Sequence, residues 1–242
     1  MKTLKVLIAF VMATTLVSCH FDINLGQEDG NGNVVTENRP VTENFDHVKG
    51  SAGIDVFLTE GSENKVVVEA DENLMDIIET EIHNGKLTIR TSNNKSIGRS
   101  KAKKVHVTYV VLKSISASSG ADVIANSIVK NETITLDASS GADLEVEVFA
   151  KEVYAETSSG ADMKVSGKAS KLVADASSGS DLNAKNLLVL TCNADASSGA
   201  DITVNVKDSL KAEASSGGDV NYYGDPAAVT NNGSRSGSVR KM

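Results

Sequence analysis

The chain has few of the residues that build enclosed pockets or crosslinked domains. Its 242 residues include no tryptophan, two prolines and two cysteines, and aromatic residues make up 4% of the total. Few aromatic side chains and few prolines fit a regular stacked sheet better than an enzyme built around a pocket. Two cysteines allow one intrachain disulfide at most.

Positively charged residues are outnumbered. The chain holds 24 lysines and arginines against 32 aspartates and glutamates, which gives a formal net charge of −8. Nucleic-acid binding requires clustered lysine and arginine, so we expect no nucleic-acid partner. An acidic surface is compatible with a polysaccharide, a protein or divalent cations as partners.

Motifs that carry catalysis are absent from the sequence. The four histidines, His20, His47, His83 and His106, are scattered, and no Ser-His-Asp set, zinc spacing or phosphate loop is visible. Cys192 stands at a repeat position that is otherwise apolar, so we expect a buried small side chain rather than a nucleophile or a ligand. The sequence predicts a protein that is not an enzyme and has no cofactor.

The N-terminus has the pattern of an export signal. A short basic head precedes an apolar stretch, and Leu16-Val17-Ser18-Cys19 resembles the bacterial lipobox. We expect residues 1–18 to be a signal peptide and Cys19 to carry a lipid anchor, which would leave Cys192 without a disulfide partner. The alternative is a signal cut elsewhere with Cys19 left over. His20 after the lipid site resembles outer-membrane sorting in Gram-negative bacteria.

The composition changes after the leader. Residues 19–44 contain glycine, asparagine and glutamate without apolar periodicity, which predicts a flexible tether. Residues 45–240 are predicted to form one domain, with an irregular β-rich N-terminal region over 45–112 and regular coils over 113–240. No other segment approaches transmembrane length.

The N-terminal region contains short β-like runs separated by turn residues. Asn84-Gly85 between two apolar runs predicts a tight hairpin, because both positions tolerate a positive φ. Residues 73–80 have the apolar spacing of one short helix, with Asp71 or Asn73 as its N-cap. Ser51-Ala52-Gly53-Ile54-Asp55 echoes the later repeats and is interpreted as an early, degenerate coil.

Six Ser-Ser-Gly tripeptides follow one another at nearly constant spacing. Their glycines are 21, 19, 19, 20 and 18 residues apart and are Gly120, Gly141, Gly160, Gly179, Gly199 and Gly217. A period this short indicates a solenoid in which each repeat forms one coil. Small or apolar residues alternate with polar ones on both sides of each tripeptide, so half-buried strands meet at a Ser-Ser-Gly corner. The glycine would supply a positive φ or a close backbone approach, and the serines would stack as hydroxyl ladders.

No six-residue subperiod of a left-handed β-helix appears among these repeats. The predicted fold is therefore all-β, a right-handed parallel β-helix with coils of about 20 residues.

Two acidic columns flank the predicted corner and point outward by alternation. The first column consists of Asp122, Asp143, Asp162, Asp181, Asp201 and Asp219. The second column consists of Asp137, Glu156, Asp175, Asp195 and Glu213, with Ser116 at its head. Calcium prefers hard oxygen ligands, so the first column is a candidate calcium site. We favour the alternative that each aspartate accepts hydrogen bonds from turn hydroxyls and amides, because the glycine-rich nonapeptide of calcium-binding β-rolls is missing.

These features together resemble one known family. The lipobox, Phe45, Gly53-Ile54-Asp55-Val56, Leu74 and the serial Ala-Ser-Ser-Gly-Ala-Asp corners are similar to the auto-transporter adhesin, head GIN domain family of exported bacterial proteins. The resemblance covers about residues 45–240. It implies a right-handed β-helix related in shape to pectin lyases but without their catalytic residues, with adhesion as the proposed role. The proline usual before the first coil is missing in Tyr109-Val110-Val111-Leu112.

Three classes of function follow from this reading. The first is a lipid-anchored adhesion or binding module of the cell envelope that faces the periplasm or the cell surface and contacts a glycan or a protein. The second is a structural or envelope-stress lipoprotein without a specific ligand. The third, a polysaccharide-active enzyme, would require aspartate, arginine and lysine converging in non-repeating positions, and the pattern shows no such break.

Overall fold

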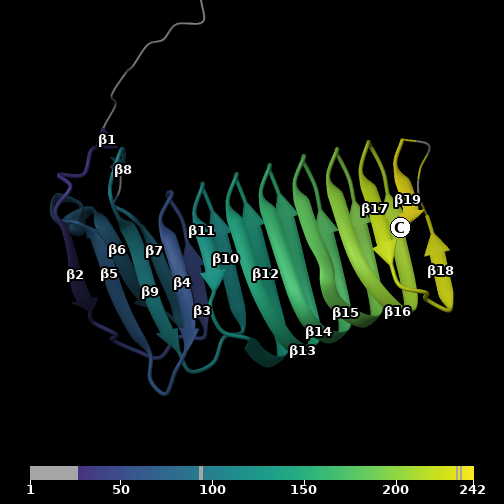
Figure 1. The fold of residues 1–242 in the computed structure, drawn as a ribbon, viewed down its shortest axis with the longest axis horizontal. Coiled ribbons are helices and arrows are strands. Elements are labelled where there is room, and N and C mark those ends of the chain that lie inside the picture. The colour runs from purple at the N-terminus through teal and green to yellow at the C-terminus, as the bar shows by residue number, and fades with distance from the viewer. Residues whose placement is uncertain (1–26, 93–94, 233, 235) are drawn as a thin grey trace, which may run out of the picture.

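The computed structural model describes residues 27–92, 95–232, 234 and 236–242. It is an elongated stack of β-coils of about seven turns (Figure 1). The predicted right-handed parallel β-helix is confirmed. The predicted signal peptide, Cys19 and His20 lie outside the described residues. Within the described residues, no helix is long and apolar enough to cross a membrane.

The N-terminal region consists of short strands and one helical turn. They are β1 (Gln27–Glu28), β2 (Val34–Arg39), β3 (His47–Gly50), β4 (Asp55–Glu60), β5 (Lys65–Asp71), the 3-10 helix η1 (Glu72–Ile77), β6 (Ile78–His83), β7 (Lys86–Thr91), β8 (Ser96–Ile97) and β9 (Lys103–Tyr109). The coils follow. They comprise β10 (Ser114–Ser118), β11 (Asp122–Ala125), β12 (Val129–Ser139), β13 (Asp143–Ser158), β14 (Asp162–Ala176), β15 (Asp181–Ala196), β16 (Asp201–Ala214), β17 (Asp219–Tyr223), β18 (Ala228–Asn231) and β19 (Ser238–Lys241).

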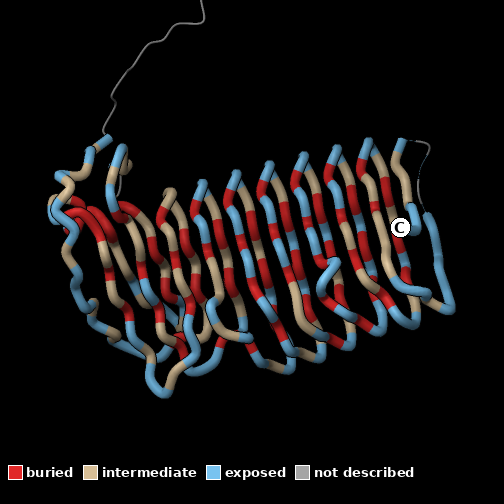
Figure 2. The backbone as a smooth tube through the Cα atoms, in the orientation of Figure 1, coloured by how far each residue is buried: buried red, intermediate tan, exposed pale blue. Residues whose placement is uncertain are grey.

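The coils stack in parallel with like residues in register near the corners, and the pairings of β14 with β15 and of β15 with β16 contain register shifts farther along. Between β13 and β14, pairing runs from Asp143 beside Asp162 to Thr157 beside Ala176. Strands β13 to β16 each continue from one corner to the next, and buried residues alternate with exposed ones along them (Figure 2). Parallel strands about 4.8 Å apart let backbone groups pair with the coils on both sides.

The interior is lined by the small and apolar columns that the sequence pattern predicts. Cys192 belongs to one of them, since it stands in register with Leu172 and Leu210 and is 2% exposed. Burial raises the pKa of the Cys192 thiol to about 12, which keeps it protonated and unreactive. The expectation of a buried small side chain at this position is confirmed.

Each Ser-Ser-Gly corner is a tight turn made of two consecutive left-handed residues. The second serine of each corner has φ between 50° and 56°, and the glycine has φ between 67° and 83°. A Cβ added at Gly120, Gly141, Gly160, Gly179 or Gly199 would meet no atom within 4 Å. Glycine is therefore needed at these corners for its backbone conformation and not for lack of space.

Backbone hydrogen bonds join the corners into a ladder. The glycine amide donates to the carbonyl of the second serine in the next coil, at 3.1 Å both from Gly120 to Ser140 and from Gly141 to Ser159. The expectation of serine hydroxyl ladders is wrong. In the described coils, hydroxyls bond to one another only at Ser180 with Thr157 and at Ser234 with Ser236. The amides and carbonyls of adjacent corners satisfy each other, so they need no serine hydroxyl as a partner. The second serine of a corner therefore stays exposed, as at Ser159.

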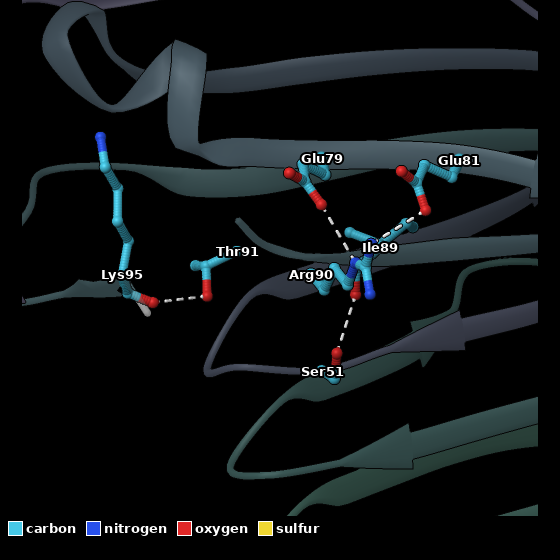
Figure 3. Close-up of polar contacts among 7 residues, drawn as sticks. All are labelled: Ser51, Glu79, Glu81, Ile89, Arg90, Thr91 and Lys95. Carbon is cyan, nitrogen blue, oxygen red and sulfur yellow. Dashed lines mark hydrogen bonds and ion pairs between the residues drawn. The ribbon is translucent and has the colours of Figure 1, made fainter. Parts of the chain in front are cut away.

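The early coil predicted at residues 51–55 is present. Ala52 and Gly53 adopt the same left-handed pair, with φ of 60° and 70°, and the Gly53 amide donates to the Ser119 carbonyl at 3.0 Å. Ser51 Oγ donates to the Ile89 carbonyl at 3.1 Å, which ties this coil to β7 (Figure 3). The corner ladder therefore begins in the N-terminal region.

Strands β6 and β7 form the predicted hairpin. Asn84 and Gly85 occupy its turn with φ of 51° and 75°. Arg90 on β7 binds Glu79 and Glu81 on β6, at 3.1 and 3.0 Å respectively (Figure 3). Cross-strand ion pairs of this kind stabilise a two-stranded unit at a sheet edge.

The helix predicted over residues 73–80 is present only in part, because η1 is a 3-10 helix that ends at Ile77 and residues 78–80 belong to β6. Asp71 stands at the N-cap position of η1 without a capping hydrogen bond. The buried Asp71 carboxylate instead accepts the backbone amides of Ala102, Gly32 and Lys101. These hydrogen bonds, that of Ala102 most of all, lower the pKa of Asp71. One carboxylate thereby joins three separate segments of the N-terminal region.

The expectation of a flexible tether over residues 19–44 is wrong for part of that range. Strand β1 pairs with β8, and β2 pairs antiparallel with β5 from Val34 beside Asp71 to Arg39 beside Val66. The strand order of the N-terminal region leaves an open edge on β5, and this polar segment covers it. Tertiary pairing here overrides a sequence that lacks apolar periodicity.

Replacing a corner glycine tests the left-handed conformation. We expect Gly160→Ala to lower the free energy of unfolding by about 1–2 kcal/mol, the cost of a left-handed φ for a residue with a Cβ. Ser159→Asn is the matched control and should leave stability unchanged or raised, because asparagine tolerates this conformation. Urea denaturation of both variants measures the difference. An unchanged midpoint for Gly160→Ala would contradict this account of the corner.

Candidate functional site: the acidic edge of the solenoid

Both acidic columns lie on the surface on either side of the stacked corners, as the alternation predicts. The strand pairing places Asp122, Asp143, Asp162, Asp181, Asp201 and Asp219 in one line. It also aligns Ser116, Asp137, Glu156, Asp175, Asp195 and Glu213. Asp55 of the early coil extends the first column toward the N-terminus, and Ser238 continues it at the other end.

A groove of about 540 Å³ runs beside the first column across four coils. One rim consists of Asp122, Asp143, Asp162 and Asp181. The other rim consists of Ile124, Glu145, Lys164 and Asn183. Leu144 and Met163 stand between the two rims along their strands, but their side chains point inward and belong to the core. The groove thus offers carboxylates, one amide, one cation and some apolar surface along a straight line.

The second rim of this groove cannot be recognised from the repeat pattern. Its positions lie two residues after the aspartates, and they hold a different residue type in every coil, as Ile124, Glu145 and Lys164 show. Columns of unlike residues leave no repeat to detect. The available signal was alternation, which places every second residue of a strand on the same face.

Like charges in register shift the acidity of the first column. Partial removal from water raises the pKa of Asp181, the neighbouring Asp162 and Asp201 raise it further, and Lys164 opposes them. The pKa of Asp143 is raised in the same way, first by loss of hydration and then by the carboxylate beside it. The ionised forms of these groups are therefore held in an unfavourable environment that a bound donor or cation would relieve.

The second column borders a smaller groove of about 180 Å³. Burial and then the neighbouring carboxylates, Asp195 first, raise the pKa of Asp175. Lys211 lies 2.8 Å from Glu213 and neutralises part of the charge. The groove beside the first column is the longer of the two, so we take it as the candidate binding site.

The six calcium candidates form a row and not a cage. Among the described residues, no three histidine, cysteine, aspartate or glutamate side chains are grouped so that they could hold a metal ion. Hydrogen bonds from turn hydroxyls and amides, the favoured alternative, are not seen in the described first column. Asp219 alone accepts a hydroxyl hydrogen bond there, and its donor is Ser238 Oγ on strand β19. No metal cage forms because each coil supplies one carboxylate to the column, and its nearest neighbours are the carboxylates of the same column one coil away.

The histidines do not assemble with serine into a catalytic set. His47 Nδ1 lies 2.5 Å from Asp46 Oδ1, and His106 Nε2 lies 3.0 Å from Glu69 Oε2. The His106 ring also stacks on Phe57. In the described part of the chain neither histidine hydrogen-bonds a serine hydroxyl. Both pairs lie in the N-terminal region, away from the groove.

A family comparison matches residues 44–226 to the family described as "Putative auto-transporter adhesin, head GIN domain". The chain belongs to this family. The resemblance seen in the corner motif and in the N-terminal region is thereby confirmed. The match begins within one residue of the predicted domain start and leaves β2 outside it. No curated protein matches this head GIN domain.

Solved structures share the fold. A crystal structure described as a putative adhesin from Bacteroides fragilis is 16% identical with a TM-score of 0.82, over 89% of this chain and 100% of that one. A putative adhesin from Parabacteroides distasonis is 20% identical with a TM-score of 0.73, over 89% and 100%. A protein from the same species described as a putative lipid binding protein is 18% identical with a TM-score of 0.70, over 89% and 99%. The family and these adhesin structures are described by adhesion and not by an enzymatic activity.

A pair of substitutions tests the electrostatic repulsion within the first acidic column. The folded-state pKa of Asp181 is raised, so its charge opposes folding at neutral pH, and we expect Asp181→Asn to raise the free energy of unfolding at pH 7 by a few tenths of a kcal/mol after screening by solvent. As the pH falls through the raised pKa, the folded wild type takes up the proton first and gains stability. The advantage of the variant should therefore vanish at about pH 3, below the ordinary pKa near 3.9.

Asp46 is the control for this test because its pKa is lowered, chiefly by Lys113 and also by His47. Asp46→Asn should therefore lose stability at pH 7, the opposite sign, and match the wild type at low pH. Thermal melts across the pH range measure both effects. A loss of stability at pH 7 in Asp181→Asn would contradict the mutual repulsion of the first column.

Proposed function

We propose that this head GIN domain is a lipid-anchored binding module of the bacterial cell envelope that holds a glycan or a protein segment in the groove beside the first acidic column. The observation that carries the proposal is the continuity of the groove over four coils with one carboxylate per coil. A repeat of about 4.8 Å suits an extended ligand that offers one donor group at each step.

The chemistry of the two rims restricts the class of ligand that the groove can bind. Ionised carboxylates accept hydrogen bonds from sugar hydroxyls or ammonium groups, and bonds to charged groups are the stronger kind. Lys164 and Asn183 supply donors, and Ile124 supplies an apolar contact. Because carboxylates predominate, a neutral or cationic glycan or a basic protein segment fits better than an anionic polymer.

The scaffold supports binding without rearrangement. Each rim residue stands on a strand that is paired on both sides by neighbouring coils. A site whose backbone is fixed by strand pairing loses little backbone freedom when a ligand binds, which favours affinity. Adhesion is the role by which the family is described, and this rigid surface suits it.

The attachment to the envelope is proposed from the lipobox. Cys19 would carry the lipid and anchor the chain to the outer membrane of a Gram-negative cell. Strand β1, the first described strand, lies at the N-terminal end of the solenoid on the side of the corners (Figure 1). The coils that line the groove extend away from that end, so an anchor at Cys19 would attach the chain at a distance from the groove.

Charge removal on the groove tests the function. Asp143→Asn, Asp162→Asn and Asp181→Asn together should weaken binding of a ligand found by glycan-array or protein-array screening by at least about ten-fold, since several charge-assisted hydrogen bonds are lost. The matched control carries Glu156→Gln, Asp175→Asn and Asp195→Asn, which change the second column in the same coils. We expect this control to bind like the wild type.

The same assays separate the alternatives. Ligand binding should be equal in millimolar calcium and in chelator. Loss of ligand binding in chelator would instead support a calcium site in the first column. Equal losses in both triple variants would contradict a role for the groove. Absence of any ligand would favour a structural or envelope-stress lipoprotein. Product release in parallel lyase and hydrolase assays would favour a polysaccharide-active enzyme.

Replacing the proposed lipid site tests the anchor. We expect Cys19→Ser to abolish labelling with a radioactive fatty acid and to move the chain from the membrane fraction to the soluble fraction. Protease treatment of intact cells that express the wild-type chain should degrade it if the domain faces the cell surface and spare it if it faces the periplasm. Retention of Cys19→Ser in the membrane fraction would contradict lipid anchoring at this residue.

A further inference from the structure

The two ends of the solenoid are closed to different extents. At the N-terminal end, η1 buries Leu74, Met75 and Ile77. At the C-terminal end, Val229 on β18 stands in register with Leu210, yet Val229 is 42% exposed and Leu210 is 2% exposed. The last coil therefore presents apolar surface that no described segment covers.

One of the two long sheets ends in strands that run in the same direction. β2 is antiparallel to β5, β5 is antiparallel to β9, and β9 is parallel to β4. β4 is in turn parallel to β11 and to the coil strands that lead to β17 and β19. β2 and β19 lie at opposite ends of the molecule (Figure 1). A second copy displaced along the solenoid axis would therefore bring β2 beside β19 in parallel orientation.

The outer edges of these two strands are available. Within the described residues, β2 pairs only with β5, and β19 pairs only with β17. Their outward N–H and C=O groups lack a strand partner there. An unpaired edge of this kind is a template for another strand.

The exposed charged side chains of β19 are cations, and those of β2 and η1 are carboxylates. Arg240 and Lys241 are exposed on β19 at the C-terminal end. At the N-terminal end Glu37 on β2 is 53% exposed, and Glu72 and Asp76 on η1 are exposed as well. Contact between two C-terminal ends would place cations against cations. Contact between unlike ends places cations against carboxylates, which favours a head-to-tail arrangement.

The alternation of the two strands restricts the register. Val239 pairs with buried Val220, so Val239 and Lys241 face the interior side of the sheet. Val35 and Glu37 pair with buried residues of β5 and face the same side. Interior residues of one strand must lie beside interior residues of the other, so only shifts of two residues are allowed.

We propose that a second copy of this chain stacks head to tail on the open C-terminal end, with β19 of one copy pairing in parallel with β2 of the next, Val239 beside Val35 and Lys241 beside Glu37. This register joins apolar to apolar and cation to carboxylate. A shift of two residues would place Lys241 beside Arg39, and a shift the other way would place it beside Val35. On the other sheet the end strands β6 and β18 run in opposite directions and would meet as an antiparallel pair.

The contact is weak and does not close on itself. Lys241 now lies 2.7 Å from Asp225, and Glu37 lies 3.2 Å from Arg39, so stacking exchanges ion pairs within the chain for ion pairs between chains. Exchange of exposed pairs contributes little net free energy and is sensitive to salt. A head-to-tail contact leaves a free end on each copy, so rods should lengthen as concentration rises. The stacking is independent of any ligand in the groove.

Cysteine trapping between two variants tests the arrangement. The full chain carries Cys19→Ser, which leaves the buried Cys192 as the only native thiol. Directly paired residues on adjacent strands lie within disulfide reach. A mixture of a Val35→Cys chain with a Val239→Cys chain should therefore form disulfide-linked dimers on mild oxidation. The control mixture replaces Val239→Cys with Thr203→Cys. Thr203 lies on β16, which is paired on both sides by β15 and β17, so this mixture should give only background dimers.

Two outcomes of the trapping overturn the proposal. A yield equal to the Thr203→Cys control excludes the predicted contact. Dimers formed by Val239→Cys chains alone, in place of mixed dimers, show tail-to-tail association. Thermal melts of every variant establish that the chains are folded, so a low yield reports on the contact and not on unfolding.

Charge reversal gives a second and independent measurement. In sedimentation velocity at low salt, Glu37→Lys should weaken association by roughly two- to five-fold, as expected for one exposed pair. Lys241→Glu should do the same, and the double variant should recover the wild-type value. Association that is unchanged in both single variants, or wild-type chains that stay monomeric at all concentrations and salt levels, would overturn the proposal.

Discussion

The fold depends on one backbone interaction, the hydrogen bond from the glycine amide of each corner to the serine carbonyl of the next. It forms because both residues adopt left-handed conformations, so the chain reverses direction within two residues. Once one coil turns in this way, the next coil satisfies the exposed amide only by turning at the same place. The corner therefore sets the register of the strand segments next to it, and register shifts farther along β14 to β16 accommodate coils of unequal length.

In-register stacking places like residues on like residues, with opposite consequences inside and outside. Inside, alanine, leucine and valine columns bury apolar surface and stabilise the stack. Outside, the same register brings aspartates into a line. Partial removal from water and then the neighbouring carboxylates raise the pKa of Asp143 and of Asp181. The carboxylates of the first column are thus unfavourably placed when ionised, and a ligand in the groove beside them could balance their charge.

Each coil of a solenoid can pair with a further coil, so the first and last coils must be covered by other elements. The N-terminal end uses η1, β2 and the buried Asp71, which binds three backbone amides. In the described part of the C-terminal end, the short strands β18 and β19 close the stack, and β19 carries exposed cations. This asymmetry gives the rod a direction. It also makes its two ends complementary in charge and in strand orientation.

Local rules were enough to predict the corners, the in-facing columns, the early coil at Ala52-Gly53 and the Asn84-Gly85 hairpin. A positive φ and a two-residue alternation depend only on neighbours along the chain. Contacts between distant segments could not be read in that way. The strand β2, the amide partners of Asp71 and the mixed rim that contains Lys164 depend on which segments the stack brings side by side. The prediction of serine hydroxyl ladders was wrong for the same reason, because the backbone amides and carbonyls of adjacent coils hydrogen-bond to one another and need no hydroxyl partner. The repeat thus determined the architecture, and only the tertiary structure decided where the groove lies and which ends stay open.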